Sequence, residues 1–518
     1  MIQSRILNTI FISALIITTS CSTSDNPDTP KMTTGNMSRD VSYVSTPLTD
    51  EFDSVISEFL SETDVIPGMS IAVVKNDKVV YLKSFGFADI ETKLEVNQDT
   101  KFYIASSFKS FTALTMLLLA EKGLIDLEAP ISKYLTTLKF SSALSAESVS
   151  VKDLLTHNLG FENDPITFRT SYSGEHDNTT LINILKESSP TEKQFSYDNL
   201  GYVMSGIIIE NVTGKPWKQV VREEVLDPLN MINTTSDMNK VTGGSYAKPH
   251  GWMGDTKKLS FMKKNNVMNA AGGHYTTAKD MINWLKVNLN GGTLNGKRIF
   301  PEELMAKAHK SQIDLDRDFY KFHRYGYGFG WYISNYDEEL LIHHFGSYTG
   351  YRAHVSFMPE HNIGIVIFVN NLSPVGVYIP DILAAYVYDR MLEKPEAISR
   401  ISEEKAGLIK KKMMFSERVE QMLAQMASRK FNLTCESETY QGTFRNESFG
   451  TLDLSYDHGL ITASIGNLSA ELTPFKKQNS MRVELVPNRG RVIDFYPSGT
   501  CSEIDSLKYM GAVWLPVN

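Results

Sequence analysis

Apolar runs at two distant places in the chain have the length and the turn signals of antiparallel strands. Residues 69–75 and 78–83 are separated by an Asn-Asp turn pair, and residues 354–358 and 363–369 are separated by a short polar turn. Each pair of runs predicts a hairpin. Because one pair lies near the start of the chain and the other lies late, we expect the late strands to complete a sheet that the early strands begin.

Apolar residues at helical spacing mark three segments around these strands. Residues 51–63 form an amphipathic pattern, residues 106–122 form a strongly apolar one that ends at Gly123, and residues 380–392 follow the late strands. Strands at both ends with helices between them predict an α/β fold whose sheet is completed by the late strands.

The pattern changes again towards the C-terminus. Residues 396–435 are charged and poor in aromatic side chains, and they predict a connector made of a pair of helices. Beyond the connector the period becomes two, with Leu452 and Leu454 alternating with polar residues. Residues 436–518 therefore predict a small all-β domain, a meander or a barrel, and residues 49–395 form the larger folded unit.

The N-terminal segment has the features of an export signal. Residues 10–17 form an apolar run that is too short to span a membrane, and small and hydroxyl residues lead from it to Cys21. A cysteine in this place resembles the lipobox of bacterial lipoproteins, so residues 1–21 predict a signal peptide with lipidation at Cys21; a plain cleaved signal is the alternative. Residues 22–48 are rich in Ser, Thr, Asn, Asp and Pro and predict a flexible linker. We therefore expect a periplasmic or cell-envelope protein whose membrane contact is its lipid anchor.

Composition narrows the function classes. The 518 residues are 42% hydrophobic and 22% charged, which excludes a disordered or fibrous protein. Acidic residues outnumber basic ones by 60 to 52, and the formal charge of −8 argues against nucleic-acid binding. No C-x-x-C pair exists and the histidines are scattered, so no metal or other cofactor is expected. Cys435 and Cys501 predict either a disulfide, which export permits, or two buried free thiols.

An S-x-x-K motif, Ser106 to Lys109, stands at the start of the apolar helix. Positions i and i+3 share a helix face, so the amine can reach the hydroxyl. Serine is a poor nucleophile without a base, and lysine acts as a base only when burial or a neighbouring cation lowers its pKa. Matches also occur at 260–263, in a Lys-rich loop, and at 402–405, in the charged connector. Of these three, the segment at Ser106 is the one that begins an apolar helix.

Two further motifs occur once each in the sequence. Tyr197 and Asn199 form the only Y-x-N; a tyrosine near an ammonium group can move protons, and an amide can position both the lysine and a substrate. His344 and Gly346 form the only H-x-G, and a glycine on an edge strand lets a substrate backbone approach closely. Taken singly, Tyr197 is equally compatible with a packed aromatic residue and His344 with a hydrogen-bonded strand histidine.

In the order S-x-x-K, Y-x-N, H-x-G, these motifs resemble those of the penicillin-recognising serine hydrolases, which include class C β-lactamases, DD-peptidases, D-aminopeptidases and related esterases. The likeness covers about residues 51–392 and includes the runs at 151–157 and 271–280. It implies a β-lactamase-like antiparallel sheet flanked by helices, with a helical cluster. The tail beyond Tyr440 resembles the lipocalin-like domain that often follows these hydrolases, either covering the catalytic cleft or playing a passive stabilising or oligomerising role.

The resemblance also implies a role for each motif residue. Ser106 is expected to be the acylated nucleophile, and Lys109 and Tyr197 are expected to share the general base and acid work. Asn199 is expected to orient Lys109 and to bind the substrate amide. The oxyanion hole is expected to consist of the backbone N–H groups of Ser106 and Ser347.

The third motif departs from the β-lactamase pattern. His344 stands where β-lactamases usually have the lysine of K-T-G, and a histidine is only partly charged near neutral pH. Together with Gly346 and Ser347 it is expected to line the substrate-binding edge, with less attraction for a substrate carboxylate than lysine provides. Arg352 is a candidate replacement partner for that carboxylate, although we expect it to be a surface arginine on a strand.

The resemblance therefore implies an exported serine hydrolase that cleaves an amide, peptide or ester bond through an acyl-serine intermediate. A peptidase, amidase or esterase is favoured over an efficient β-lactamase. The alternatives are a β-lactamase, a penicillin-binding sensor or carboxypeptidase, and a non-catalytic binding module. The expected partner is a small-molecule or peptide substrate and not nucleic acid, and the sequence is compatible with an oligomer.

Overall fold

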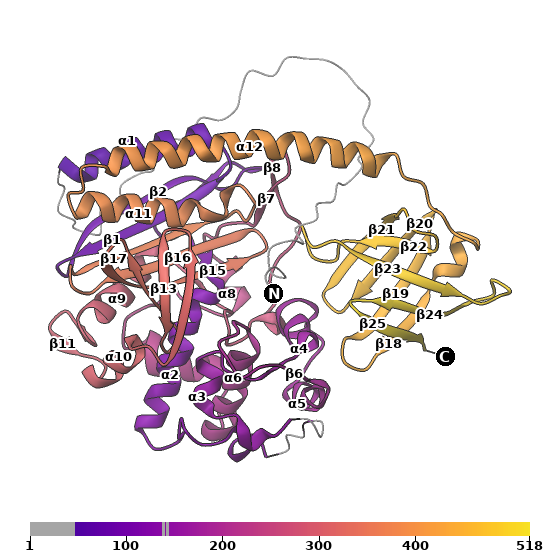
Figure 1. Cartoon of the computed structure of the whole chain (residues 1–518), viewed down its shortest axis with the longest axis horizontal. Helices are drawn as coiled ribbons and strands as arrows, with labels where there is room; N and C mark the ends of the chain where they lie inside the picture. The colour runs from indigo at the N-terminus through magenta and orange to yellow at the C-terminus, as the bar shows by residue number, and fades with distance from the viewer. Residues whose placement is uncertain (1–46, 137–139, 141–143, 518) are drawn as a thin grey trace.

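The computed structural model of the protein describes residues 47–136, 140 and 144–517. The predicted signal peptide at 1–21 and almost all of the predicted linker at 22–48 lie outside these residues. The described chain contains an α/β unit and a β-barrel, which a long helix connects (Figure 1).

A nine-stranded antiparallel sheet forms the centre of the α/β unit. The early hairpin lies beside the last late strand, with Met69 paired to Val369, so the late strands complete the sheet as the sequence predicts. In spatial order the strands are β12 (Ile313–Phe319), β13 (Phe322–Tyr327), β14 (Tyr332–Tyr336), β15 (Glu339–Tyr348), β16 (Tyr351–Met358), β17 (Ile363–Val369), β1 (Gly68–Lys75), β2 (Lys78–Asp89) and β3 (Leu94–Glu95).

Helices cover both faces of this sheet, because both faces of its central strands are apolar. Phe52 and Ile382 pack on one face against Ile71, while Phe111 packs on the other face in the same cluster as Ala72. The first face carries α1 (Pro47–Thr63), α11 (Ile379–Met391) and α12 (Ala397–Ala427); the other carries α2 (Lys109–Glu121), α9 (Ala278–Leu289) and α10 (Glu302–His309).

Six helices beside α2, most of them short, form the predicted helical cluster, which supplies the second wall of the site described below. They are α3 (Val151–Leu155), α4 (Asp164–Phe168), α5 (Asn178–Ile184), α6 (Leu200–Thr213), α7 (Trp217–Val221) and α8 (Met238–Thr242). Four small strand pairs lie among them and at the margins of the unit: β4 (Phe102–Tyr103) with β9 (Tyr275–Thr276), β5 (Phe161–Glu162) with β6 (Ser189–Pro190), β7 (His250–Trp252) with β8 (Thr256–Lys258), and β10 (Thr293–Leu294) with β11 (Lys297–Arg298).

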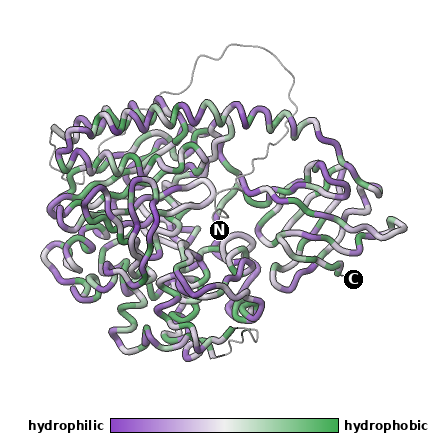
Figure 2. Tube along the Cα trace, in the orientation of Figure 1, coloured by the Kyte–Doolittle hydropathy of each residue, from purple (hydrophilic) through white to green (hydrophobic). Residues whose placement is uncertain are grey.

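The connector is one continuous helix of 31 residues, α12, in place of the two helices that the sequence was expected to form. It contains no proline, and its one glycine, Gly407, is exposed and meets no neighbouring atom, so nothing interrupts the helix. Hydrophilic and hydrophobic positions alternate along it (Figure 2). Ile401 and Leu408 face the α/β unit, and Lys405 pairs with two glutamates of α1.

The C-terminal strands close into an eight-stranded antiparallel barrel, which confirms the predicted lipocalin-like all-β domain. Leu452 and Leu454 point into its core together with Trp514, as the alternating pattern predicts. The strands are β18 (Gly442–Asn446), β19 (Gly450–Asp457), β20 (Leu460–Ile465), β21 (Leu468–Pro474), β22 (Ser480–Val483), β23 (Arg491–Pro497), β24 (Ile504–Tyr509) and β25 (Ala512–Pro516).

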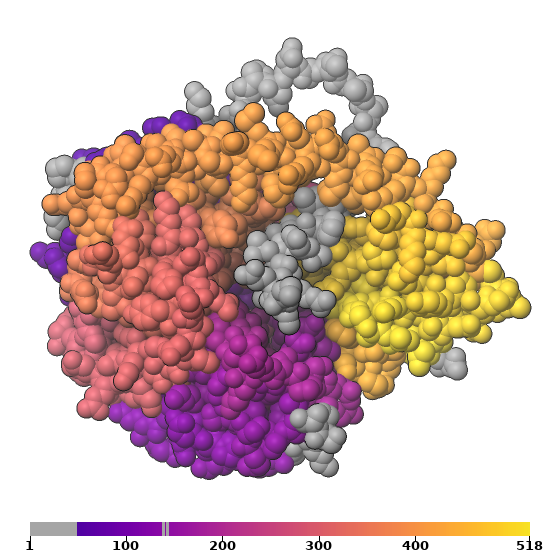
Figure 3. Space-filling model, in the orientation of Figure 1, coloured from indigo at the N-terminus to yellow at the C-terminus, as the bar shows by residue number. Residues whose placement is uncertain are grey.

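The barrel also touches the α/β unit directly, at the π-helical turn η4 (Arg169–Ser173). The Arg169 guanidinium is buried and donates to the backbone carbonyls of Glu447 and Ser448. The barrel thus lies against the helical cluster while α12 passes over both parts (Figure 3). The two parts are therefore held together at two separate places.

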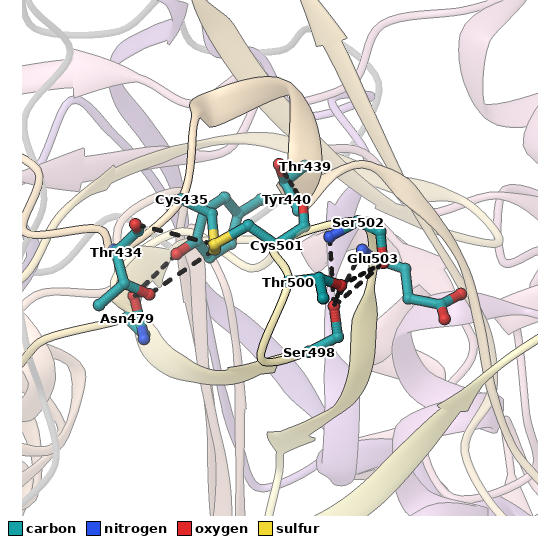
Figure 4. The surroundings of a disulfide bond; sticks show 10 residues. All are labelled: Thr434, Cys435, Thr439, Tyr440, Asn479, Ser498, Thr500, Cys501, Ser502 and Glu503. Carbon is teal, nitrogen blue, oxygen red and sulfur yellow. Dashed lines mark hydrogen bonds between the residues drawn. A yellow bond between two sulfur atoms is a disulfide. The ribbon is translucent and has the colours of Figure 1, made fainter.

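Cys435 and Cys501 form a disulfide, which decides between the two alternatives that the sequence left open. The bond joins the segment after α12 to the loop between β23 and β24, with the two Cα atoms 5.5 Å apart (Figure 4). Beside it, the Tyr440 hydroxyl donates to the side-chain carbonyl of Asn479 at 2.7 Å. The entry of the chain into the barrel is thus fixed by a covalent bond and by a hydrogen bond.

Candidate active site

Ser106 lies in a tight turn, the 3₁₀ helix η1 (Ala105–Phe108), immediately before α2. The preceding residue, Ala105, has a φ of 45°, a left-handed conformation that non-glycine residues rarely adopt. Gly272 packs so closely on Ala105 that a side chain at 272 would meet its backbone. The turn is therefore held in a strained conformation, and Ser106 stays partly exposed at its surface.

Lys109 is fully buried one turn further along. Its Nζ lies 3.1 Å from the Ser106 Oγ, 2.6 Å from the Asn199 Oδ1 and 2.9 Å from the Ala271 carbonyl oxygen. Burial lowers the pKa of Lys109 to about 7, against the opposing charge of Asp198. A large fraction of Lys109 is therefore neutral at physiological pH, as a general base must be.

The Y-x-N segment stands at the start of α6, where side chains often cap the helix. Asn199 does not cap it, because its side-chain carbonyl accepts the hydrogen bond from Lys109. The Asp198 Oδ1 takes the capping role and accepts from the backbone N–H of Gly201 at 2.9 Å. Two neighbouring side chains of the motif thus have different roles: Asp198 caps the helix, and Asn199 binds Lys109.

The Tyr197 hydroxyl is buried between these groups. It has no hydrogen-bond partner of normal geometry among the described residues, although Ser106 lies close enough to influence it. Burial raises the pKa of Tyr197 well above its usual value, and the proximity of Ser106 offsets only part of the rise. Tyr197 is therefore a neutral phenol whose proton is free to bond to a bound molecule.

The last part of β15 has a free edge beside η1. Its pairing with β14 ends at His343, so residues 344–348 pair with β16 alone. A side chain at Gly346 would meet the Ile104 carbonyl, and only glycine allows β15 to come this close to the segment before Ser106. The edge strand and the nucleophile turn therefore form adjoining walls.

His344 does not have the environment that the sequence suggested. The ring is fully buried, its Nε2 faces the Tyr327 hydroxyl at 3.2 Å and its Nδ1 faces the Phe345 carbonyl at 2.7 Å. Burial, together with the charge of Lys109, holds the pKa of His344 well below its usual value. The imidazole is therefore a neutral ring with hydrogen-bond partners inside the protein, and its place on the substrate-binding edge stays a prediction.

Arg352 is not the surface arginine that we expected. It is 2% exposed, it donates to the Ser347 Oγ at 2.5 Å and it pairs with Asp381 at 2.9 Å. Burial by itself raises the pKa of Asp381, but Arg352 and a hydrogen bond from His354 hold it below its usual value. The carboxylate partner of Arg352 is thus internal to the protein.

A cavity of about 290 Å³ lies next to the Y-x-N motif. The cavity reaches Tyr197 and Asn199, so a molecule bound there would lie beside the Y-x-N motif. Its lining consists of Leu159, Gly160, Phe161, Glu162, Asn163, Asp164, Thr167, Thr191, Ser196, Tyr197, Asp198, Asn199 and Leu200.

The other S-x-x-K segments named above do not form such a pair. Lys263 is buried but donates to the backbone carbonyls of Ser171 and Val267, and Lys405 pairs with glutamates of α1. Within the described ranges there is no group of three or more His, Cys, Asp or Glu that could hold a metal ion. No helix in the same ranges is both long enough and apolar enough to cross a membrane.

Sequence reasoning missed several groups of the site. The Ala271 carbonyl, which holds Lys109, lies in a run that was noticed only for its family likeness. His157 lies in another such run, and nothing in the local sequence marks Tyr327 or Asp381. Each of these groups acts through a contact between distant parts of the chain.

Comparison with known proteins agrees with this geometry. The Beta-lactamase family matches residues 52–387. The protein named flp from Staphylococcus aureus (strain MRSA252) is 28% identical over 339 residues, and the match spans 64% of each chain, so the chain matches under two thirds of that relative's length.

Two solved structures share the fold. One is the octameric penicillin-binding protein homologue from Pyrococcus abyssi. The alignment takes in 90% of this chain and 99% of the homologue, at a TM-score of 0.58 and 23% identity. The other is the D-amino acid amidase from Ochrobactrum anthropi SV3. The alignment takes in 69% of this chain and 99% of the amidase, at a TM-score of 0.55 and 20% identity. Since the family match takes in more than half of the chain, the chain belongs to the Beta-lactamase family and has the fold of its serine hydrolases.

Proposed function

We propose that this protein is a serine hydrolase that cleaves amide, peptide or ester bonds through an acyl intermediate on Ser106. The observation that carries the proposal is the buried amine of Lys109, 3.1 Å from the Ser106 hydroxyl and with a pKa of about 7. A lysine with this pKa can take a proton from serine at neutral pH, whereas an ordinary lysine cannot.

The arrangement supports a two-step reaction. In the first step the Ser106 Oγ attacks the substrate carbonyl carbon while its proton passes to Lys109, and Tyr197 delivers its proton to the leaving nitrogen or oxygen as the scissile bond breaks. The proton on Lys109 then passes to Tyr197, so that both groups regain their starting protonation before the second step. In the second step water attacks the acyl-serine, the same groups take the proton from the water, and the proton returns to the Ser106 Oγ as the acid product leaves. Asn199 holds Lys109 in place throughout, and the backbone N–H groups of Ser106 and Ser347 are the proposed oxyanion hole.

The substrate-binding edge favours amides, peptides and esters over β-lactams. A β-lactam carries a carboxylate, yet His344 is neutral and Arg352 is already paired with Asp381. A neighbour described as a D-amino acid amidase has the same fold, which supports amide cleavage. The alternative, a β-lactamase or penicillin-binding carboxypeptidase, is supported by the neighbour described as a penicillin-binding protein homologue.

A covalent probe tests the nucleophile directly. A fluorophosphonate should label the wild type and should fail to label Ser106→Ala, while Ser110→Ala, which removes a hydroxyl from the first turn of α2, should be labelled like the wild type. Lys109→Ala should lose about 10³-fold or more in rate, because nucleophile and base act as a unit. Equal labelling of Ser106→Ala and the wild type would show that another residue is the nucleophile.

A substrate screen then separates the two activities. D-aminoacyl amides, short esters and a chromogenic β-lactam should be assayed with the chain from residue 47 onwards. Turnover of amides or esters with slow β-lactam cleavage is the expected result. Rapid turnover of the β-lactam alone would favour the alternative.

We also propose that the protein is exported and lipid-anchored at Cys21. Support comes from the apolar run at 10–17 and from the disulfide between Cys435 and Cys501, which fits an oxidising compartment. Metabolic labelling with a palmitate analogue should modify the wild type and not Cys21→Ala. Labelling of both would contradict attachment at this cysteine.

Assembly into an oligomer is a further proposal. Its support is the neighbour described as octameric. Light scattering coupled to size exclusion measures the mass directly, and a mass close to 58.2 kDa would contradict it.

A further inference from the structure

Three buried side chains form an unbroken line of hydrogen bonds between the Y-x-N and H-x-G motifs. The Asp198 backbone nitrogen lies 3.2 Å from the His157 Nδ1, and the His157 Nε2 lies 3.2 Å from the Tyr327 hydroxyl. That hydroxyl lies 3.2 Å from the His344 Nε2, and the His344 Nδ1 lies 2.7 Å from the Phe345 carbonyl. His157, Tyr327 and His344 are each 0% exposed.

The two ends of this line fix the direction of every bond in it. A carbonyl can only accept, so His344 carries its proton on Nδ1 and accepts on Nε2 from the Tyr327 hydroxyl. Tyr327 must then accept from the His157 Nε2–H, which leaves the His157 Nδ1 to accept from the Asp198 backbone N–H, a group that can only donate. The Asp198 carboxylate is farther from this nitrogen, at 3.5 Å, and burial lowers the pKa of His157, so the neutral ring fits. The same tautomers satisfy all four bonds.

The surroundings of His344 favour a neutral ring as well. Lys109 and Arg324 both lie close enough to lower its pKa, and an imidazolium here would add a further buried positive charge beside them. The titratable or charged groups that face the ring, from all elements packed against it, are Lys109, His157, Tyr197, Tyr327, Tyr332 and Arg324. None of these six is a carboxylate.

We propose that His157 and Tyr327 are positioning residues, which act through His344 to hold the free edge of β15 in register with the Y-x-N motif. His344 is then a neutral link and not a cation for the substrate. The line joins the backbone beside Asn199 to the backbone beside Gly346, which are the two sides of the proposed substrate site. The proposal rests on the hydrolase function proposed above and adds to it two residues outside the three motifs.

A single hydroxyl at the centre of the line provides the first test. Tyr327→Phe removes the middle bonds and keeps the ring, so it should lower kcat by about 10- to 100-fold with little change in KM, because misplaced groups cost rate more than binding. The control is Tyr336→Phe, which removes another buried hydroxyl, bonded to Asp389 at 2.8 Å, and should leave kcat within about 2-fold. Equal effects of the two variants on kcat would overturn the positioning role.

The charge of His344 provides a second test, which distinguishes a neutral link from a cation that binds the substrate carboxylate. For a substrate with a terminal carboxylate and its amide analogue, the ratio of the two kcat/KM values should be constant from about pH 5.5 to about pH 8.5. If His344 were the cation for that carboxylate, the ratio would fall roughly 10-fold as pH rises through its titration. A ratio that falls in wild type and is flat in His344→Gln would overturn the neutral link.

A third measurement needs no turnover and therefore separates this proposal from the proposed function. Thermal unfolding of His157→Gln, Tyr327→Phe and the double variant forms a double-mutant cycle. Because both positions share one line of bonds, the drop in Tm of the double variant should be clearly smaller than the sum of the single drops. Additive drops would overturn the line of bonds, whereas failure of Ser106 to react with the probe would overturn only the hydrolase.

Discussion

The two faces of β15 carry buried polar networks of opposite character. On one face, His344 continues a line of neutral groups through Tyr327 to His157. On the other, Arg352 and Asp381 form an ion pair with both side chains at most 2% exposed. One strand thus separates a network without net charge from one held together by charge.

The difference follows from what each face lies against. The neutral line faces Lys109, whose pKa must stay near 7 for the proposed chemistry, and a charge added beside it would move that pKa. The ion pair lies behind the strand and supplies its own counter-charge, so its field at the lysine is small. The comparison teaches two ways in which a buried ionisable group can stay beside a base with little effect on its pKa: the group can be kept neutral, as His344 is, or it can be paired with a counter-charge, as Arg352 is.

The largest expected effect is on the charged face. Asp381→Asn removes the counter-charge of a buried Arg352 and should lower the free energy of unfolding by about 3–5 kcal/mol. Urea denaturation with a spectroscopic readout measures it. The matched control is Asp227→Asn, which breaks an exposed pair with Arg222 and should cost at most about 1 kcal/mol. A similar small loss in Asp381→Asn would remove the contrast between the two faces.

A smaller effect is expected on the neutral face, and it depends on pH. His344 stays neutral in the folded chain because burial holds its pKa well below 6.5, whereas the unfolded chain binds a proton below that pH. The free energy of unfolding therefore falls as pH drops below about 6.5, by up to about 1.4 kcal/mol per pH unit for each such histidine. His344→Gln should reduce this slope by up to about 1.4 kcal/mol per pH unit, the contribution of one such histidine. Urea denaturation between about pH 6.5 and about pH 5 measures the slope.

The charged face should not show this dependence in the same window. The pKa of Asp381 is lowered below 3.8, so its contribution is fully present above about pH 4 and is lost only as pH falls through its folded-state pKa. The stability difference between wild type and Asp381→Asn should therefore be constant from about pH 5 to about pH 6.5. An unchanged slope in His344→Gln would instead show that His344 is charged in the folded state.

The smallest effect concerns the lysine itself. The wild-type kcat/KM should rise as pH increases through about 7, because the neutral amine of Lys109 is the base. Asp198→Asn removes the charge that raises the pKa of Lys109 and keeps an oxygen for the Gly201 N–H, so the rise should move to lower pH by less than about one unit. A pH–rate profile for a single good substrate measures it, and a move to higher pH would contradict the assignment of Lys109 as the base.

Local patterns predicted most of the fold. The hairpin at 69–83, the apolar helix that follows Ser106 and the alternation of Leu452 and Leu454 are all features of neighbouring residues, and the structure contains each of them. The prediction for the connector was wrong because it also relied on a local feature, the density of charged residues, which suggested two helices. The segment contains no proline, so one helix continues through it.

The site was partly predictable. Spacing alone places Lys109 beside Ser106, and the order of the motifs points to Asn199. The buried charge of Arg352 is compensated by Asp381, which lies in α11 beyond the next strand. The hydrogen bonding of His344 depends on Tyr327 from another strand. Such pairings are decided by tertiary packing, so the sequence around each residue does not contain them.

The disulfide has a consequence for how the barrel responds to proteolysis. The two cysteines are 66 positions apart and enclose strands β18 to β23 in one covalent ring. A single cut in any loop of that ring opens it without releasing a fragment, since both ends stay attached at Cys435 and Cys501. A nicked barrel would therefore keep its mass until a reductant separates the pieces, so gels run with and without thiol would reveal damage that activity assays miss.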